Sequence, residues 1–402
     1  MSEEFYRIKR LPPYVIAEVN AMRAAARARG EDIIDLGMGN PDLPPPPHVI
    51  EKLCEVAQKP DAHGYSASRG IPGLRRAQAN YYARRFGVEL DADKEVVVTL
   101  GSKEGLASLA TAITAPGDCI LAPNPSYPIH TFGFIIAGAT VRSVPTTPDE
   151  AYFAALDRAM AFTVPRPTLL VVNYPSNPTA ETVDLAFYER LVAWAKREKV
   201  WIVSDLAYSE LYYDGQPTPS ILQVPGAKDV AIEFTSLSKT YSMAGWRVGF
   251  AVGNPVLIEA LGRVKSYIDY GSFTPIQAAA CAALNGPQDI VDANRELYHK
   301  RRDVLVESFG RAGWDIPAPR ASMFAWAPLP PALAHLGSLE FSKQLLTEAG
   351  VAVAPGVGYG EDGEGFVRIA LVENEQRLRQ AARNVKRYLQ SMGVNTPSQS
   401  AG

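Results

Sequence analysis

The sequence has few cysteines and no long uninterrupted hydrophobic run. Three cysteines in 402 residues (Cys54, Cys119 and Cys281) lie far apart and form no CxxC pair. We expect them to be reduced thiols of a cytoplasmic protein, because disulfide frameworks belong to short secreted chains with paired cysteines. The sequence contains no stretch of about 18 apolar residues, the length that a membrane-spanning helix needs. The N-terminal segment lacks the apolar core of a signal peptide.

An excess of charge of either sign is also absent. Lys and Arg total 40 against 43 for Asp and Glu, a formal net charge of −3. Neither nucleic acid nor an anionic membrane is therefore an expected partner. The 5 histidines are scattered without a carboxylate or cysteine at ligand spacing, so we expect no metal site. What is present is 47% hydrophobic and 21% charged residues, ordinary values for a globular protein.

Short apolar segments alternate with helical patterns along the chain. The apolar residues between positions 185 and 198 follow one stripe of a helix. This alternation predicts an α/β fold, in which a mostly parallel central sheet is sandwiched by helices and accompanied by a smaller α+β domain. The buried strands are expected at residues 96–100, 119–122, 169–172, 201–204, 231–235 and 248–252.

Composition changes at both ends of this block predict the domain boundaries. The four prolines at 44–47 cannot continue a helix or a sheet ladder and predict a stiff extended connector. A long polar helical pattern at 289–312 follows an Asn-Gly-Pro sequence. We therefore expect an N-terminal arm at 1–47 that contributes to the small domain, a large cofactor-binding domain at 48–286, a small domain at 287–394 and a disordered tail at 395–402.

The segment most specific for chemistry contains Ser236, Ser238 and Lys239 and is followed by Arg247. A lysine after a buried strand is costly to bury unpaired, and a Schiff base with a carbonyl cofactor would remove that cost. The hydroxyls and the planar guanidinium of Arg247 suit a phosphate. Taken alone, the segment leaves a second interpretation open, an exposed lysine at the end of a strand.

Five segments resemble, in order, motifs of the class I/II (fold type I) aminotransferases. Residues 235–240 resemble the lysine motif of that family, 173–179 its NPxNPT motif and 204–208 its Asp-x-x-Tyr motif. Residues 101–105 resemble its phosphate loop, and 366–370 the stretch that holds its substrate-carboxylate arginine. The resemblance covers almost the whole chain, and further segments such as SYIDYGSFTP are similar to bacterial glutamate–pyruvate (alanine) aminotransferases.

The resemblance implies roles around pyridoxal 5′-phosphate. Lys239 would bind the cofactor covalently and move the substrate α-proton, and Asp205 would keep the ring nitrogen protonated, which makes the ring an electron sink. Tyr208 and Asn177 would hydrogen-bond the phenolic oxygen of the cofactor, and Tyr127 would stack on its ring. The implied phosphate ligands are Ser102, Lys103, Ser236, Ser238, Arg247 and, from the neighbouring subunit of a homodimer with shared active sites, Tyr65.

For the substrate, the resemblance implies that Arg368 binds the α-carboxylate, that Asn177 lies beside it and that Gly39 lets the backbone approach it.

The sequence also departs from the family. Residues 268–270 contain no arginine where dedicated aspartate enzymes take one from the neighbouring subunit, so discrimination for dicarboxylates should be looser. Val357 replaces a serine often found after the preceding Pro-Gly, which puts one polar contact in doubt.

These roles predict a transaminase of amino-acid biosynthesis that exchanges amino groups between an L-amino acid and a 2-oxo acid in two half-reactions. Alanine/pyruvate with glutamate/2-oxoglutarate is the expected pair. One alternative is a β-C–S lyase acting on cysteine conjugates, which would share every cofactor residue but release pyruvate without an oxo-acid acceptor. The other is a non-catalytic regulator that senses the cofactor; it would need a DNA-binding motif ahead of the domain, where roughly forty residues show no basic patch.

Overall fold

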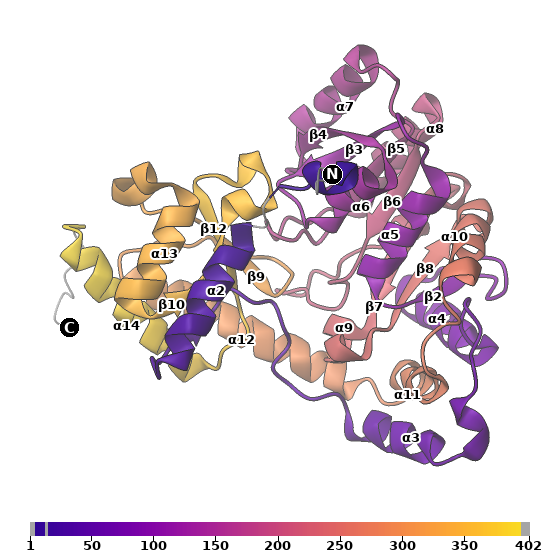
Figure 1. The fold of residues 1–402 in the computed structure, drawn as a ribbon, viewed down its shortest axis with the longest axis horizontal. Coiled ribbons are helices and arrows are strands. Elements are labelled where there is room, and N and C mark those ends of the chain that lie inside the picture. Colours follow the sequence, from indigo (N-terminus) through magenta and orange to yellow (C-terminus); the bar gives the residue numbers. More distant parts are fainter. Residues whose placement is uncertain (1–4, 13–14, 395–402) are drawn as a thin grey trace.

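The structure, a computed structural model, describes residues 5–12 and 15–394. Figure 1 shows two groups of elements bridged by the long helix α12 (Asp289–Arg311). The larger group is built on a seven-stranded sheet with the strand order β2-β8-β7-β6-β5-β3-β4. These strands are β2 (Val96–Thr99), β3 (Cys119–Asn124), β4 (Thr140–Pro145), β5 (Leu169–Asn173), β6 (Trp201–Asp205), β7 (Ala231–Ser236) and β8 (Gly249–Gly253).

The sheet is mostly parallel, as predicted. Strands β4, β3, β5, β6 and β7 pair in parallel, whereas β8 runs antiparallel to both of its neighbours. Six strands lie where the apolar segments predicted them, with small shifts at their ends. The prediction missed β4, because this edge strand is largely exposed and its polar residues break the apolar pattern.

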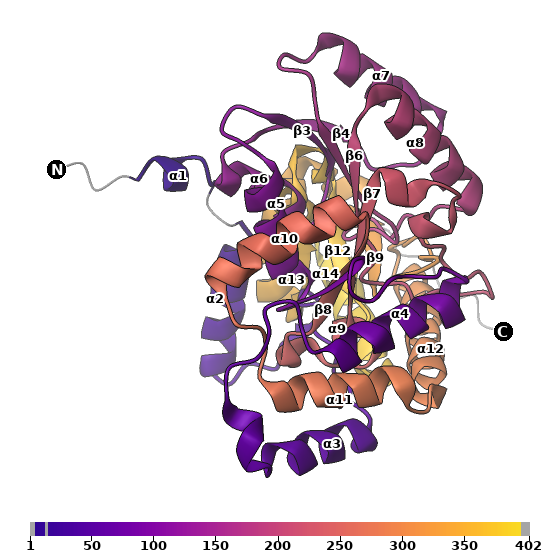
Figure 2. The same cartoon turned by 90° about the vertical axis from the view of Figure 1, so that its right-hand side faces the viewer.

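Helices cover both faces of the sheet, and alternate strand residues face each layer. Val97 packs with α5 (Ser102–Ile113), α6 (Ile129–Ala137) and α10 (Pro255–Ile268). Val96 and Val98 pack on the other face, with α4 (Pro72–Phe86), α7 (Glu150–Phe162), α8 (Leu185–Glu198) and α11 (Thr274–Asn285). Figure 2 shows α3 (Pro47–Ala57) outside α11, away from the sheet.

The start of α3 corrects one prediction. Pro46 is extended, with φ −56° and ψ 141°, but Pro47 is the first residue of the helix. The expectation of an extended connector through Pro47 was therefore wrong. The physical reason is that the first helical position needs no N–H donor and favours the fixed φ of proline.

The second group has its own core and two small sheets. One sheet has the order β11-β12-β9 and is antiparallel, and the other pairs β1 with β10 in parallel. Because β1 comes from the N-terminal segment and pairs with β10, part of that segment lies in this group. The elements are α2 (Val15–Ala28), β1 (Ile34–Asp35), β9 (Phe324–Pro328), α13 (Gly337–Ala349), β10 (Val351–Ala352), β11 (Ala354–Pro355), β12 (Phe366–Ala370) and α14 (Glu375–Ser391).

The domain division at residues 47/48 and 286/287 stays a prediction, and the expected disordered tail at 395–402 lies outside the described residues. Within residues 5–12 and 15–394, no helix is both long and apolar enough to cross a membrane.

Candidate active site

A cavity of about 460 Å³ lies between the sheet and the second group of elements. On the sheet side, Asn173, Asp205 and Ser236 reach it from the last residues of β5, β6 and β7. The carboxyl ends of parallel strands are the usual place for a ligand site in an α/β fold. The predicted site residues that line the cavity are Gly39, Ser102, Lys103, Tyr127, Asn177, Asp205, Tyr208, Ser236, Ser238, Lys239, Arg247 and Arg368.

Lys239 lies on a short helix, α9 (Leu237–Thr240), that begins directly after β7. The Ser236 hydroxyl accepts a hydrogen bond from the Ser238 N–H at 3.1 Å and so caps this helix. Lys239 Nζ donates to the Gly39 carbonyl oxygen at 2.6 Å. Burial, together with the positive charges of Arg368 and Arg247, lowers the pKa of Lys239 to about 8. The side chain therefore points into the cavity and is not the exposed lysine of the alternative interpretation.

Asp205 presents a buried carboxylate with one free oxygen. Its Oδ2 hydrogen-bonds His130 Nε2 at 2.8 Å, and His130 itself is fully buried. Among the described residues, Asp205 Oδ1 has no hydrogen-bond partner. A buried acceptor without a partner is costly, and a cationic N–H group at the cavity would satisfy it. Sequence reasoning missed His130; its one local signal was its position three residues after Tyr127, whose ring it contacts edge-on.

Asn173 and Asn177 connect the ends of β5 and β6 to the second group. Asn173 Nδ2 donates to the Asp205 carbonyl oxygen at 2.8 Å, and Asn173 Oδ1 accepts from the Asn177 N–H at 2.8 Å. Asn177 Oδ1 in turn accepts from Arg368 Nη1 at 2.9 Å. Asn173 was not predicted as a site residue, although it opens the motif that contains Asn177.

Arg368 is 7% exposed and has only neutral partners among the described residues. Its Nη2 donates to the Gly37 carbonyl oxygen at 2.9 Å, and its Cζ lies 3.9 Å from the Phe324 ring centroid and 4.9 Å from that of Tyr359. No described carboxylate forms an ion pair with it, so its charge lacks an anionic partner among the described residues. A buried guanidinium of this kind suits a carboxylate ligand.

Ser102, another cavity residue, is the first residue of α5, and Arg247 lies close to the preceding Gly101. Gly101 has a φ of +82°, and a Cβ there would lie 2.1 Å from Arg247 Nη2, so only glycine fits. Arg247 Nη2 donates to the Leu100 carbonyl oxygen at 3.2 Å. Free N–H groups at the start of a helix, serine hydroxyls and a guanidinium together form a cradle for an anion.

Two predicted tyrosines complete the walls. Tyr208 is buried, contacts the Phe324 ring edge-on with a centroid distance of 5.7 Å, and has its pKa raised by burial. Tyr127 lies near Lys103, whose Nζ is 5.7 Å from its ring centroid. Both phenols are therefore held by packing at the cavity.

Tyr65 does not line the cavity. It is 90% exposed, and its ring centroid lies 4.7 Å from that of Tyr270, also exposed. The contact predicted between Tyr65 and a neighbouring subunit therefore stays a prediction.

The second group contributes Gly39 and Arg368, which were predicted, and further residues that were not. A Cβ on Gly39 would lie 2.4 Å from the Phe324 ring, which explains why glycine stands there. Ile16, Asn20, Phe324 and Tyr359 had no motif signal, because only tertiary packing brings them to the site. The other unpredicted cavity residues lie within three positions of predicted ones: Gly37, Met38, Asn40, Ala207 and Ala244.

The chain is similar to known proteins over almost its whole length. The family model described as aminotransferase class I and II matches residues 31–385. A Rhizobium meliloti (strain 1021) protein named AatC is 61% identical over 389 residues, covering 97% of this chain and 96% of that protein. Glutamate-pyruvate aminotransferase AlaC of Escherichia coli (strain K12) is 55% identical over 390 residues, covering 97% of this chain and 95% of that protein.

A more distant relative carries a different substrate in its name. The LL-diaminopimelate aminotransferase of Moorella thermoacetica is 43% identical over 387 residues, covering 96% of this chain and 98% of that protein. Among solved structures, substrate-bound BacF from Bacillus subtilis superposes with a TM-score of 0.91 at 33% identity, covering 96% of this chain and 98% of that chain.

Proposed function

The chain belongs to the class I and II aminotransferases, which depend on pyridoxal phosphate, and from this premise we propose that it exchanges amino groups between alanine/pyruvate and glutamate/2-oxoglutarate. The observation that carries this proposal is the similarity to the E. coli glutamate-pyruvate aminotransferase over nearly the full length of both chains.

The cavity fits pyridoxal phosphate at each of its polar ends. Asp205 Oδ1, buried and without a partner among the described residues, would accept the N–H of a protonated ring nitrogen. Lys239 Nζ would hold the carbonyl carbon covalently, and Tyr208 and Asn177 would bind the phenolic oxygen beside the Tyr127 ring. The phosphate would be bound by Ser102, Lys103, Ser236, Ser238 and Arg247, with Gly101 leaving the room that Arg247 needs.

When bound, pyridoxal phosphate supplies a carbonyl carbon for the amino group and a ring that accepts the electron pair left by the α-proton. Lys239 Nζ is suited to take that proton, because a pKa of about 8 leaves part of the amine neutral near neutral pH. Arg368 would bind the α-carboxylate and thereby orient the α-C–H bond toward Lys239. Asp205, oriented through Oδ2 by His130, would hold the proton on the ring nitrogen.

A homodimer with shared active sites belongs to the same proposal. Tyr65, Tyr267 and Tyr270 are strongly exposed, and Tyr65 and Tyr270 pack on each other. Exposed aromatic clusters of this kind mark association surfaces. Tyr65 would reach the phosphate bound by the partner subunit.

The cytoplasmic location remains a prediction.

Half-reactions of the purified holoprotein test the substrate assignment. We expect L-alanine and L-glutamate each to convert the visible absorbance of the cofactor, and pyruvate and 2-oxoglutarate each to restore it. The relatives named LL-diaminopimelate aminotransferases make LL-diaminopimelate the second candidate. Faster conversion by LL-diaminopimelate than by alanine would overturn the proposal in favour of that substrate, and pyruvate release from a cysteine conjugate without an acceptor would favour the lyase.

A further inference from the structure

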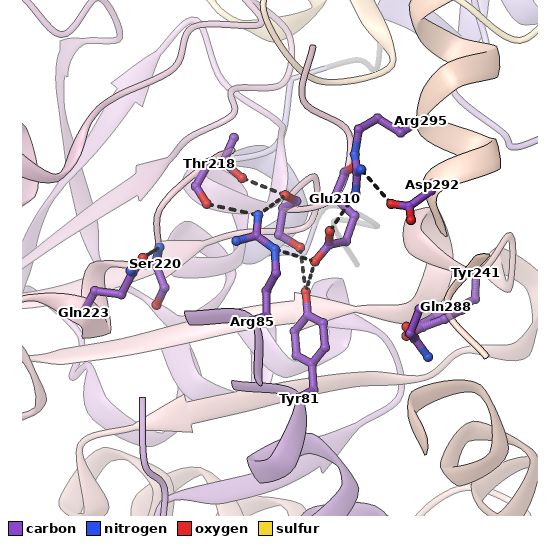
Figure 3. Close-up of polar contacts among 11 residues, drawn as sticks. Tyr81, Arg85, Glu210, Thr218, Ser220, Gln223, Tyr241, Gln288, Asp292 and Arg295 are labelled. Carbon is purple, nitrogen blue, oxygen red and sulfur yellow. Dashed lines mark hydrogen bonds and ion pairs between the residues drawn. The ribbon is translucent and has the colours of Figure 1, made fainter. Parts of the chain in front are cut away.

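A cluster of charged and polar side chains surrounds Glu210, two residues after the cavity residue Tyr208 (Figure 3). Its centre is Glu210, which is 5% exposed. Glu210 Oε1 accepts hydrogen bonds from Tyr81 Oη at 2.6 Å and Arg85 Nε at 3.0 Å, and Oε2 accepts from Arg295 Nη2 at 3.2 Å. Tyr81 and Arg85 come from α4, whereas Arg295 comes from α12.

The same side chains also hold the main chain of the turn at residues 207–210. Arg295 Nε donates to the Glu210 carbonyl oxygen at 2.9 Å. The Ser209 carbonyl oxygen accepts from Thr218 Oγ1 at 2.7 Å and from Arg85 Nη2 at 3.3 Å. Tyr208 belongs to this turn. The backbone that places its phenol in the cavity is therefore bound by side chains from two helices, α4 and α12.

Helix α12 binds the Lys239 segment as well. Tyr241, two residues after Lys239, donates through its Oη to Gln288 Oε1 at 2.7 Å, at the start of α12. Asn294, the residue before Arg295, donates through Nδ2 to the Thr240 carbonyl oxygen at 3.4 Å. Gln288 and Arg295 are about 10 Å apart along the helix. Helix α12 therefore contacts both the Lys239 segment and the turn that contains Tyr208, and it fixes the position of one relative to the other.

The charges make Glu210 the residue on which this arrangement depends. Two guanidiniums surround one carboxylate, and the Tyr212 ring lies near both, 4.0 Å from Arg295 Cζ and 5.5 Å from Arg85 Cζ. Removing the carboxylate charge would leave two partly buried cations without the anion between them, which is costly. Asp292, which pairs with Arg295 Nη1 at 2.8 Å, is largely exposed and forms no hydrogen bond with residues 207–210 in the described part of the chain.

We propose that Glu210 is a positioning residue for the amino-transfer reaction: by joining Arg85 and Arg295, it fixes the turn at 207–210 between α4 and α12 and thereby sets Tyr208 relative to Lys239. This inference rests on the proposed roles of Tyr208 and Lys239 at the cofactor. It concerns a residue outside the cavity, which acts only through Tyr208.

A double-mutant cycle on the holoprotein tests it. Glu210→Gln should lower kcat/KM for alanine about tenfold or more and shift the visible absorption maximum of the bound cofactor, at unchanged cofactor content. In the Tyr208→Phe background, the same substitution should change kcat/KM by less than about twofold and leave the absorption maximum in place, because the group it positions is gone. Asp292→Asn, the matched control, removes a partner of Arg295 that lies away from the turn and should behave as the parent.

The proposal is overturned if Glu210→Gln keeps the parental kcat/KM and spectrum. It is also overturned if Glu210→Gln lowers kcat/KM by the same factor in the Tyr208→Phe background as in the parent. Should Glu210→Gln fail to fold, Tyr81→Phe removes a single donor to Glu210 and must show the same dependence on Tyr208. If the parent protein transaminates neither alanine nor glutamate, the proposed function fails, while the spectral shift and its loss in the Tyr208→Phe background still decide the role of Glu210.

Discussion

The buried imidazole of His130 binds one oxygen of the Asp205 carboxylate, 2.8 Å away, and leaves the other oxygen without a partner among the described residues. The two side chains come from different elements, α6 and the end of β6. The hydrogen bond fixes the rotation of the carboxylate, so Oδ1 is available to a group in the cavity. An anion held in this way can stabilise a positive charge that water would otherwise screen.

The first prediction follows from this pair. His130→Leu should leave the Asp205 carboxylate poorly oriented, and we expect kcat for alanine to fall by about 10- to 100-fold, as when the hydrogen-bond partner of a metal ligand is removed. His130→Asn, which retains a donor, should recover part of that loss. Steady-state kinetics with cofactor content measured in parallel checks this, and parental kcat in the leucine variant would show that Asp205 needs no such support.

A second prediction concerns the covalent role of Lys239. Lys239→Ala should fold and still bind pyridoxal phosphate through the anion cradle around Arg247, but borohydride reduction should leave no cofactor attached to the chain. Turnover should fall by at least about a thousandfold, which corresponds to ~4 kcal/mol in barrier height. Lys300→Ala, which alters an exposed lysine, is the control. Mass spectrometry that finds the cofactor on another lysine, or activity above a tenth of the parental value, would contradict the assignment.

The residues on one side of the cavity could be predicted from the sequence better than those on the other side. Asp205 ends a strand, and Lys239 and Asn177 follow strands within a few residues. The apolar character of these strands is visible in the sequence, so the neighbourhood of these three residues could be inferred. His130 and Phe324 could not, because their contacts with Asp205 and Arg368 join positions far apart in the chain. Strand β4 was missed for a related reason: its exposed edge position removes the apolar signal on which strand prediction depends.

A third prediction uses the pKa of Lys239. Burial, Arg368 and Arg247 lower that pKa from 10.5 to about 8. Because the neutral amine is the nucleophile, covalent attachment of pyridoxal phosphate to the apoprotein should accelerate as pH rises through about 8 and level off above it. Arg368→Leu removes a neighbouring positive charge and should move this midpoint upward. Stopped-flow absorbance from pH 6 to 10 measures it, and a parental midpoint near that of a free lysine would contradict the burial argument.

The same shift affects the stability of the apoprotein. Below about pH 8 the lysine is protonated in both states, and the folded state bears the full cost of burying its charge. Between about 8 and 10.5 the unfolded chain binds more protons than the folded one, so this contribution to stability improves as pH rises. Comparing the free energy of unfolding of the parent and of Lys239→Met should therefore show a difference that shrinks across this window, whereas a constant difference would exclude the linkage.

A fourth prediction addresses Arg368, whose guanidinium has only neutral partners among the described residues. Arg368→Ala should raise KM for alanine and for pyruvate, since the α-carboxylate is bound in both the ground and the transition state, and should lower kcat as the orientation of the substrate is lost. The absorbance of the bound cofactor should barely change. Kinetics that leave kcat/KM unaltered for both substrates would show that another group binds the carboxylate.

The last prediction tests the charge of Asp205. Asp205→Asn keeps the size of the side chain and a hydrogen bond to His130 but removes the anion, and a neutral amide cannot hold a proton on the ring nitrogen of the cofactor. Lys239 remains in place, so the cofactor should still attach, while removal of the α-proton becomes slow and shows a large deuterium isotope effect at the α-position. An N-methylated cofactor analogue carries a fixed positive charge and should restore part of the rate in the asparagine variant, because it supplies what the carboxylate otherwise maintains. Parental turnover of alanine by Asp205→Asn, or an analogue that binds normally without any rescue, would show that Oδ1 of Asp205 serves another group.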